Sequence, residues 1–348
     1  MTERYLLAVV LPCWNCAEYI SELLDSLLAQ TFSDWKAFFV DDGCTDGTDA
    51  IIRKYASKDA RIIYSKRARE PKGAPTCRNI GFDLSEGARY VVFMDADDLV
   101  APYCFEQRVS AMERNEGFDF LSFPGKAFIK DPFDGLRWGF GVRGAQETLL
   151  SLLNWRTLQI TVCTNIYKKS SIIGKGLTWD ENLLCMQDAD YNIQALTKGM
   201  THSFVEKAPI DYYYRQVNNS VSKQIYEDQK TESHLYFIDK TVSSIRNRYG
   251  ARYDYYLKSY IVVFFDFFQK KRRPYFRLLK MPFIMKNPSF FVRILLYAIL
   301  GAKGKKFLFW PYYQYNIFSV KEWHSIVTNK IGAMVTQKSS FQSFCTKR

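Results

Sequence analysis

The first hundred residues alternate between short apolar runs and segments with helical spacing. Tyr5 to Leu11 is a continuous apolar run with β-branched members, typical of a strand buried on both faces. Ala17 to Gln30 has its apolar residues at the spacing of one helix face. The same pattern predicts strands at 37–40, 61–64 and 89–94 and helices at 46–58 and 74–85. Such alternation favours the α/β class, with a mostly parallel sheet flanked by helices.

Polar clusters follow three of these predicted strands. They are Pro12-Cys-Trp-Asn15, Asp41-Asp-Gly-Cys-Thr-Asp46 and Asp95-Ala-Asp-Asp98. In parallel sheets the carboxyl ends of the strands meet at one edge, and ligands bind there. The sequence therefore predicts one site to which three separate segments contribute.

The cluster at 95–98 places carboxylates directly after a buried strand. Oxygen ligands suit hard divalent cations such as Mg²⁺ or Mn²⁺. Such an ion neutralises charge on a diphosphate as a bond to a phosphate oxygen breaks. The competing interpretation is an acidic loop that only contacts solvent, but the two further polar clusters favour a metal site.

Two other segments have both a binding and a structural interpretation. Asp42 is suited to accept hydrogen bonds from a base or ribose, and the alternative is a turn whose aspartate caps a helix. The segment Gly73 to Asn79 opens a helix, whose N-terminus attracts phosphate. Within it, Arg78 offers a planar fork for phosphate or carboxylate, or pairs with an aspartate at a strand end. Both roles are compatible.

Asp188 begins a predicted helix at 188–198 and has two interpretations. A carboxylate facing an acceptor acts as a general base, whereas the alternative is simple capping of the helix. The spacing alone favours capping. The three histidines are too scattered to predict a metal cluster or a triad. The cysteines predict reduced thiols, since the one C-x-x-C has no second pair for zinc.

The charge is distributed unevenly along the chain. Residues 1–220 carry 25 Lys/Arg and 29 Asp/Glu, whereas residues 221–348 carry 23 and 7. Residues 270–306 contain eleven Lys/Arg and no acid, together with Phe, Tyr and Leu. We expect this segment to contact an anionic membrane surface, the alternatives being a helical bundle packed on the catalytic domain or nucleic acid. Nucleic acid is the least favoured partner because no RRM, KH or zinc-finger signature is present. No secretory signal or membrane-spanning segment is expected.

Taken together, these motifs resemble the GT-A glycosyltransferases of family 2. The resemblance rests on Leu11 to Asn15, Asp41 to Asp46, Gly73 to Asn79, Asp95 to Asp98 and Gln187-Asp188, in that order. It covers about residues 5–222, and the Tyr-Tyr-Arg and Asn-Ser-x-Ser segments at 213–222 match bacterial polysaccharide-type members. It implies a catalytic domain at 1–222, with a nucleotide-binding half at 1–100 and an acceptor half at 101–222. Residues 223–348 would form a helical basic extension.

The resemblance also implies an inverting transfer from a nucleotide-sugar, with UDP as the expected nucleotide, to a glycan or a lipid-linked acceptor. The implied nucleotide-sugar-binding residues are Pro12, Asn15, Asp41, Asp42, Arg78 and Asp95. Asp97 would ligate Mn²⁺ or Mg²⁺, and Asp188 would take the proton of the acceptor hydroxyl. The implied location is the cytoplasmic face of the cell membrane, and the implied process is cell-surface polysaccharide assembly.

The chain departs from the family pattern at three positions. Cys44 stands for the usual Ser, Cys77 for Ala and Gln187 for the Glu before the base. The first two are small replacements, and Gln187 removes one negative charge beside Asp188. A catalytically inactive GT-A module that only binds a nucleotide-sugar is the alternative function. The intact Asp95, Asp97 and Asp188 favour an enzyme. A nucleotidyltransferase is disfavoured because the loop after the first strand lacks a G-x-G-x-R pattern.

Overall fold

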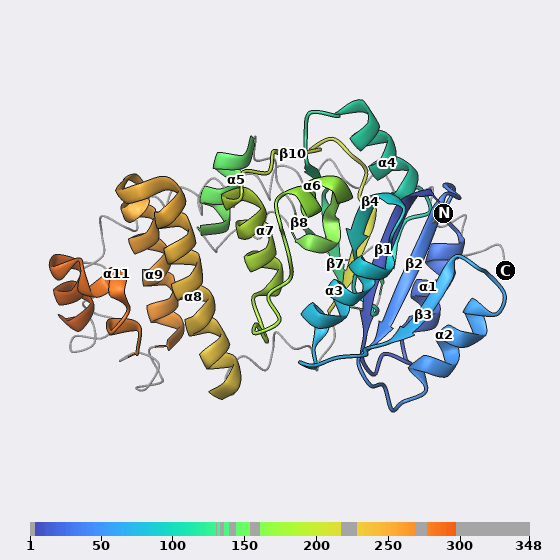
Figure 1. Cartoon of the computed structure of the whole chain (residues 1–348), viewed down its shortest axis with the longest axis horizontal. Helices are drawn as coiled ribbons and strands as arrows, with labels where there is room; N and C mark the ends of the chain where they lie inside the picture. The colour runs from blue at the N-terminus through green and yellow to red at the C-terminus, as the bar shows by residue number, and fades with distance from the viewer. Residues whose placement is uncertain are drawn as a thin grey trace. The chain divides into compact units, whose positions relative to one another are not determined.

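The computed structural model describes residues 4–129, 131–132, 136–138, 144–153, 161–216, 228–268 and 277–296 (Figure 1). The chain divides into two compact units, and the division falls between Gly250 and Ala251. The expected domain boundary at 222 lies in the segment 217–227, outside the described residues. The helix that follows this segment, α8, belongs to the first unit.

The first unit contains two sheets. The strands are β1 (Tyr5–Cys13), β2 (Trp35–Asp41), β3 (Ile62–Lys66), β4 (Ala88–Phe93), β5 (Leu99–Val100), β6 (Phe120–Ser122), β7 (Gly125–Phe128), β8 (Leu136–Trp138), β9 (Asn165–Lys168), β10 (His202–Phe204) and β11 (Tyr212–Arg215). The larger sheet has the order β10-β6-β9-β4-β1-β2-β3, and the smaller has the order β5-β11-β7-β8. Strands β4, β1, β2 and β3 are parallel, as predicted, whereas β9 is antiparallel to both of its neighbours.

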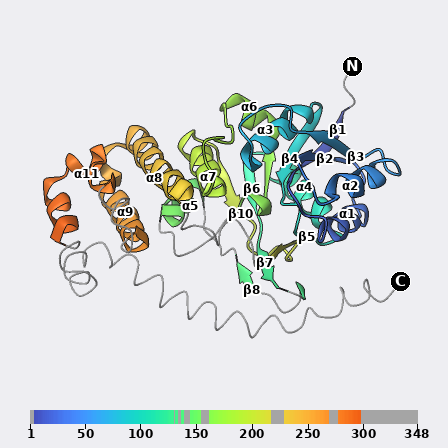
Figure 2. The ribbon, with the colours of Figure 1, turned by 90° about the horizontal axis from the view of Figure 1, so that it is seen from below.

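Helices cover both faces of the larger sheet. The helices of the first unit are α1 (Ile20–Leu28), α2 (Thr48–Ala56), α3 (Ala74–Leu84), α4 (Cys104–Arg114), α5 (Gly144–Leu153), α6 (Lys169–Gly174), α7 (Gln187–Thr197) and α8 (Asp228–Tyr249), of which α8 packs on α7. Figure 2 shows α3 and α6 on one side of the sheet and α1 and α4 on the other. The second unit contains α9 (Asp254–Phe268) and α11 (Pro282–Met285). Short 3₁₀ turns are η2 (Val162–Thr164) and η4 (Gly250–Tyr253).

The alternation of side chains along β1 explains this layering. Leu7, Val9 and Leu11 point to one face, where they join the apolar stripe of α1 in a fully buried cluster. Val10 points to the opposite face and meets α3 at Gly81, where an added Cβ would lie 2.5 Å from the Val10 Cγ1 atom. Both faces of β1 are therefore apolar, and α3 approaches the sheet closely because Gly81 has no side chain.

Most elements agree with the sequence-based expectations for the first hundred residues. Beyond the first hundred residues, 162–164 form η2, and the strand β9 begins directly after it at Asn165. Within the described residues, no helix combines the length and the apolar character that a membrane span requires.

Candidate active site

The carboxyl ends of β1 and β2 lie side by side, and hydrogen bonds connect the loops that follow them. Cys13 is in register with Asp41, and the Asp42 N–H donates to the Cys13 carbonyl at 2.8 Å. Asn15 adopts a left-handed backbone with φ of 48°, and its side-chain oxygen accepts the Thr45 N–H at 2.8 Å. Pro12, at the end of β1, is half-buried. The predicted residues of the first two clusters thus meet at one sheet edge.

Asp41 organises the loop that follows β2. Its carboxylate accepts the N–H groups of Gly43 and Cys44 at 2.9 and 2.7 Å and the Tyr64 hydroxyl at 2.6 Å. Burial opposes ionisation, but these hydrogen bonds together lower the pKa of Asp41 below its ordinary value. The sulfur of Cys44 accepts the Asn15 N–H at 3.4 Å. The cysteine at position 44 is therefore accommodated as a small polar side chain.

Asp42 is held by an arginine that the sequence analysis did not single out. Arg67 Nε donates to the Asp42 carboxylate at 2.7 Å, and the Gly73 N–H donates to the same oxygen at 3.2 Å. Arg67 also pairs with Glu70 at 2.9 Å. Arg67 lies just after β3, and no motif in the sequence relates its position to that of Asp42. Only the pairing of β2 with β3 brings the two residues together.

Arg78 connects the end of β4 with the start of α7. Its Nη2 atom donates to Asp95 at 2.6 Å, and its Nη1 atom donates to the Gln187 side-chain oxygen at 3.1 Å. The same Nη1 atom lies 4.0 Å from the Asp188 carboxylate. The guanidinium also lies over the ring of Trp179, 4.4 Å from its centroid. Arg78 is therefore a buried structural arginine that carries a positive charge beside two predicted site residues.

The surroundings of Asp188 suit a base that works near neutral pH. Burial raises the pKa of Asp188 to about 6, the charge of Arg78 opposes this rise, and the charge of Asp95 adds to it. The side chain still exposes 34% of its surface, so a substrate can reach it. Gln187 accepts a hydrogen bond from Arg78 without adding a further negative charge. The substitution of the usual Glu is thus compatible with the local geometry.

The three aspartates after β4 have different environments. Asp98 is fully buried and accepts the Arg215 N–H at 2.7 Å and the Tyr212 hydroxyl. Burial raises the pKa of Asp97 to about 6, and the charge of Asp95 adds to the rise. The Asp97 carboxylate makes no hydrogen bond or ion pair with another described residue, whereas Asp95 is paired with Arg78. Of the three carboxylates, Asp97 is thus the one without a partner among the described residues.

The residues present fit a divalent cation. The ligand atoms of Asp95, Asp98 and Cys163 lie within 4.8 Å of one another. Asp98 already accepts two hydrogen bonds, and burial raises the pKa of the Cys163 thiol well above its ordinary value, so these two groups suit a hard cation poorly. Asp97, the predicted ligand, is not in this set. Asp97 as a metal ligand therefore stays a prediction, and the absence of any described hydrogen-bond or ion-pair partner for its carboxylate is compatible with it.

Two residues of β11 are part of the site although their motif alone carried little information. Arg215 Nε donates to the Asp97 backbone carbonyl at 2.8 Å, and its Nη2 atom donates to Glu22 on α1 at 2.8 Å. Tyr212 and the Arg215 backbone hold Asp98. The smaller sheet places them there, because β11 pairs with β5, which follows the aspartate cluster directly.

Lys240 of α8 holds together two acidic residues near the predicted base. Its Nζ atom lies 2.6 Å from Asp180 and 2.8 Å from Asp190, which is two residues beyond Asp188 on α7. The Lys240→Met variant should lower the free energy of unfolding by about 3 kcal/mol, because it leaves two buried carboxylates without their cation. Urea unfolding measures this. The variant Lys54→Met, at an exposed lysine, is the matched control. If both variants lower the free energy of unfolding by the same small amount, the prediction is wrong.

The sequence of this chain is similar to that of a known protein family. The family model "Glycosyl transferase family 2" matches residues 8–172. The uncharacterized glycosyltransferase EpsJ of Bacillus subtilis is 26% identical, over 70% of this chain and 71% of its own length. The putative teichuronic acid biosynthesis glycosyltransferase TuaG of the same organism is 29% identical, over 66% of this chain and 87% of its own.

The fold also has a solved relative. The structure of S. aureus TarS 1–349, determined in complex with UDP-GlcNAc, matches with a TM-score of 0.62 and 21% identity. The match covers 91% of this chain and 92% of that chain. The strand-end carboxylates, the parallel sheet that positions them and these comparisons agree: residues 8–172 belong to glycosyltransferase family 2, and the fold is of the GT-A type.

Proposed function

We propose that this enzyme transfers a sugar, with inversion at the anomeric carbon, from a nucleotide-sugar to a hydroxyl of a glycan or lipid-linked acceptor. The relatives that are named for teichuronic and teichoic acid synthesis support a role in assembling cell-surface polysaccharides. TarS was solved with UDP-GlcNAc, which makes UDP-sugars the first donors to test. The observation that carries the proposal is the position of Arg78 between two carboxylates. Its guanidinium donates to Asp95 at the end of β4 and lies 4.0 Å from Asp188, whose pKa is raised.

The proposed roles are those that the family resemblance implies. Pro12, Asn15, Asp41 and Asp42 form the loops of the nucleotide pocket, and Asp42 is the group that meets the base. A divalent cation, when bound by Asp97, supplies positive charge to the departing diphosphate. Asp95 is positioned by Arg78 to contact the ribose beside it. Together these contacts would hold the anomeric carbon at this edge of the sheet, where Asp188 at the start of α7 could reach the acceptor hydroxyl.

The proposed reaction is a single displacement. The acceptor oxygen forms a bond to the anomeric carbon while the bond from that carbon to the phosphate oxygen breaks, and its electron pair leaves with the diphosphate. Asp188 takes the proton of the attacking hydroxyl. A module that only binds a nucleotide-sugar would have no need for a carboxylate whose pKa is raised to about 6 while it remains accessible.

A donor screen tests the proposed activity. The full chain is incubated with Mn²⁺ or Mg²⁺ and a panel of UDP-, GDP- and dTDP-sugars, and released nucleotide is measured with and without lipid-linked acceptors. Release should depend on the metal and should fall to background in Asp97→Ala. Mn²⁺ plus UDP should also raise the melting temperature of the wild-type protein, because a ligand that binds only the folded state stabilises it. Binding without release under every acceptor condition would favour the inactive module.

We further propose that the second unit contacts an anionic membrane surface, at the cytoplasmic face of the cell membrane. In the helical residues 288–296, Phe290 and Ile294 are fully buried, whereas Val292, Leu295 and Leu296 on the other side expose 39–50% of their surface. Met285 exposes 61%. Of the basic segment 270–306, the structure describes residues 277–296, and the clusters at 270–273 and 303–306 lie outside them. An outward apolar stripe among cations fits anionic headgroups.

Vesicle sedimentation tests the membrane contact. The full chain should bind vesicles of phosphatidylglycerol and phosphatidylcholine, and binding should fall at least about tenfold in a Lys280→Glu/Lys286→Glu variant, since each surface cation contributes about 1 kcal/mol. The variant Lys54→Glu/Lys58→Glu, which changes two exposed lysines of the first unit, is the matched control. Equal binding of both variants, or equal binding to pure phosphatidylcholine, would contradict this proposal.

A further inference from the structure

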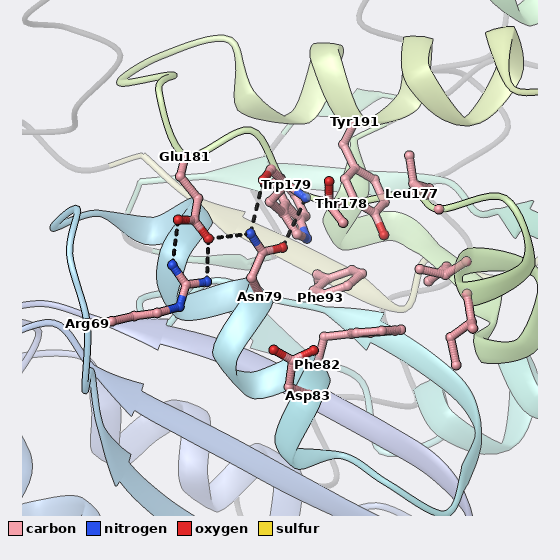
Figure 3. A pocket seen from close by; sticks show the side chains of 13 residues that line it. Arg69, Asn79, Phe82, Asp83, Phe93, Leu177, Thr178, Trp179, Glu181 and Tyr191 are labelled. Carbon is pink, nitrogen blue, oxygen red and sulfur yellow. Dashed lines mark hydrogen bonds and ion pairs between the residues drawn. The ribbon is translucent and has the colours of Figure 1, made fainter.

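A cavity of about 510 Å³ lies on the α3 side of the larger sheet, apart from the loops that hold Asp41 and Asp42. Figure 3 shows its lining, which comes from the segment after β3 that contains Arg69, from α3, β4, α6 and α7, and from the segment 176–181. Phe82, Phe93, Ile172 and Leu177 provide apolar walls. The volume and the mixture of apolar walls with a few polar groups are typical of a small-molecule site.

The polar network at the rim of this cavity is satisfied internally. Arg69 forms two hydrogen bonds with Glu181, both at 2.6 Å, and Glu181 also accepts the Asn79 side-chain amide at 2.7 Å. Asn79 in turn exchanges two hydrogen bonds with the Trp179 backbone, each at 3.0 Å. These contacts fix the segment 176–181 against α3. They also commit the Arg69 cation to Glu181, so it does not offer a free charge to an anion.

Three residues that line the cavity carry polar side-chain atoms without a hydrogen-bond partner among the described residues: Tyr191, Asp83 and Trp179, whose Nε1 atom is buried. Tyr191 is 1% exposed, and its hydroxyl makes no hydrogen bond with any described residue. Figure 3 shows this hydroxyl directed among the side chains that line the cavity. Asp83 is an exposed residue whose carboxylate lines the same cavity and likewise forms no hydrogen bond or ion pair within the described part of the chain. The Tyr191 hydroxyl is not among the fully buried polar atoms that lack a partner, so it is open to the cavity, where a ligand can pair with it.

The chemistry of these groups selects the class of ligand. Glu181 is neutralised by Arg69, so the carboxylate of Asp83 is what disfavours an anion such as a second nucleotide or phosphate. A purely apolar chain would leave the Tyr191 hydroxyl without a partner. A neutral sugar ring satisfies both requirements, because its C–H face packs on apolar and aromatic side chains while its hydroxyls pair with Tyr191 and Asp83.

We infer that this cavity is a saccharide subsite, separate from the donor site, that holds a neutral sugar unit of the acceptor. The assignment to the acceptor rests on the proposed function. Trp179 links the two sites: its ring stacks on Tyr191, with centroids 4.3 Å apart, and it also packs against Arg78 of the catalytic cluster. A sugar unit in the cavity would therefore lie against the residues that position Asp95 and Asp188.

Direct binding in the absence of turnover tests this inference. The full chain is saturated with Mn²⁺ and UDP, so that the donor site is filled, and is titrated with methyl glycosides of glucose, galactose and N-acetylglucosamine. Saturation-transfer NMR and calorimetry report binding. We expect Tyr191→Phe to weaken binding roughly 3- to 10-fold and Asp83→Asn to weaken it about tenfold, the usual effects of one neutral and one charge-assisted hydrogen bond. Tyr103→Phe and Asp49→Asn, which lie outside the cavity, are matched controls.

The outcomes separate this inference from the proposed function. Saccharide binding that is weakened by both cavity variants and by neither control supports the subsite. Binding that is unchanged in the cavity variants, or the absence of binding by all three glycosides while UDP still binds, overturns it. Failure of UDP itself to bind contradicts the proposed function instead. Binding of an alkyl chain such as octanol in preference to the glycosides would also overturn the subsite, because it would identify the cavity as an apolar site.

Discussion

Replacing Asp188 with asparagine should lower the rate of sugar transfer at saturating substrate by roughly 10²–10⁴-fold, the usual contribution of a positioned general base. Asparagine has nearly the same shape but cannot take the proton of the acceptor hydroxyl. Arg78 keeps its hydrogen bonds to Asp95 and Gln187 in this variant, so the affinity for UDP should change little. Nucleotide release with acceptor measures the rate, and a UDP titration measures the affinity.

The pH dependence of the wild-type rate is part of the same prediction. Burial raises the pKa of Asp188 to about 6, and only the ionised carboxylate accepts a proton. The rate should therefore be highest above pH 6 and fall about tenfold per pH unit below it. Saturating Mn²⁺ is needed in this experiment, because Asp97 has a similarly raised pKa and its protonation would weaken metal binding. The residual rate of Asp188→Asn should lack this acidic limb.

Asp49 gives the matched control for this variant. It lies in the first turn of α2, as Asp188 lies in the first turn of α7, so Asp49→Asn removes an equivalent helix-end charge away from the site. We expect the control to keep the wild-type rate and pH profile. If Asp188→Asn retains more than a tenth of the wild-type rate, or keeps the acidic limb, Asp188 is not the base.

Replacing Asp211 with asparagine should lower the free energy of unfolding by about 3–5 kcal/mol, the cost of leaving one partner of a buried ion pair without its counterion. Asp211 and Arg108 are both fully buried, and Arg108 donates to the Asp211 carboxylate at 2.8 and 2.9 Å. Burial acts to lower the pKa of Arg108, but the charge of Asp211 outweighs it and raises the pKa. The guanidinium therefore stays charged when Asp211 is neutralised. Urea unfolding measures the loss.

A surface pair of the same chemistry provides the control. Arg61 and Asp59 form an arginine–aspartate pair at 2.7 Å, but their side chains are 30% and 24% exposed. Asp59→Asn should therefore cost less than about 1 kcal/mol. The double variant Arg108→Met/Asp211→Leu should recover part of the stability, because it removes both buried charges together. Similar losses for Asp211→Asn and Asp59→Asn would show that the buried pair is not the cause.

This ion pair illustrates what the sequence analysis missed. Arg108 and Asp211 are 103 positions apart, and neither belongs to a motif. Arg108 also donates to the Cys163 carbonyl at 2.9 Å, which ties α4 to the residue beside Asp95. A pattern of local spacing contains no information on such a pair, since its partners meet only after the two sheets have formed. Arg67 and Lys240 were missed for the same reason.

The sequence by itself determined the layered α/β architecture, the parallel strands β1 to β4 and the edge at which Asn15, Asp42 and Asp95 meet. It could do so because side-chain periodicity is local and because strand-end positions in a parallel sheet necessarily converge. The family resemblance extended this to the roles expected of Asp97 and Asp188.

Only the tertiary structure decided what each carboxylate of the site contacts. Adjacent aspartates in one motif differ sharply: Asp98 is buried beneath Tyr212 and Arg215, whereas Asp97 keeps an uncompensated carboxylate. The cavity beside Tyr191 likewise exists only where six separate segments of the chain meet. The physical reason is that burial and charge compensation depend on groups brought together from distant parts of the chain, and these set the pKa and the ligand chemistry of each residue.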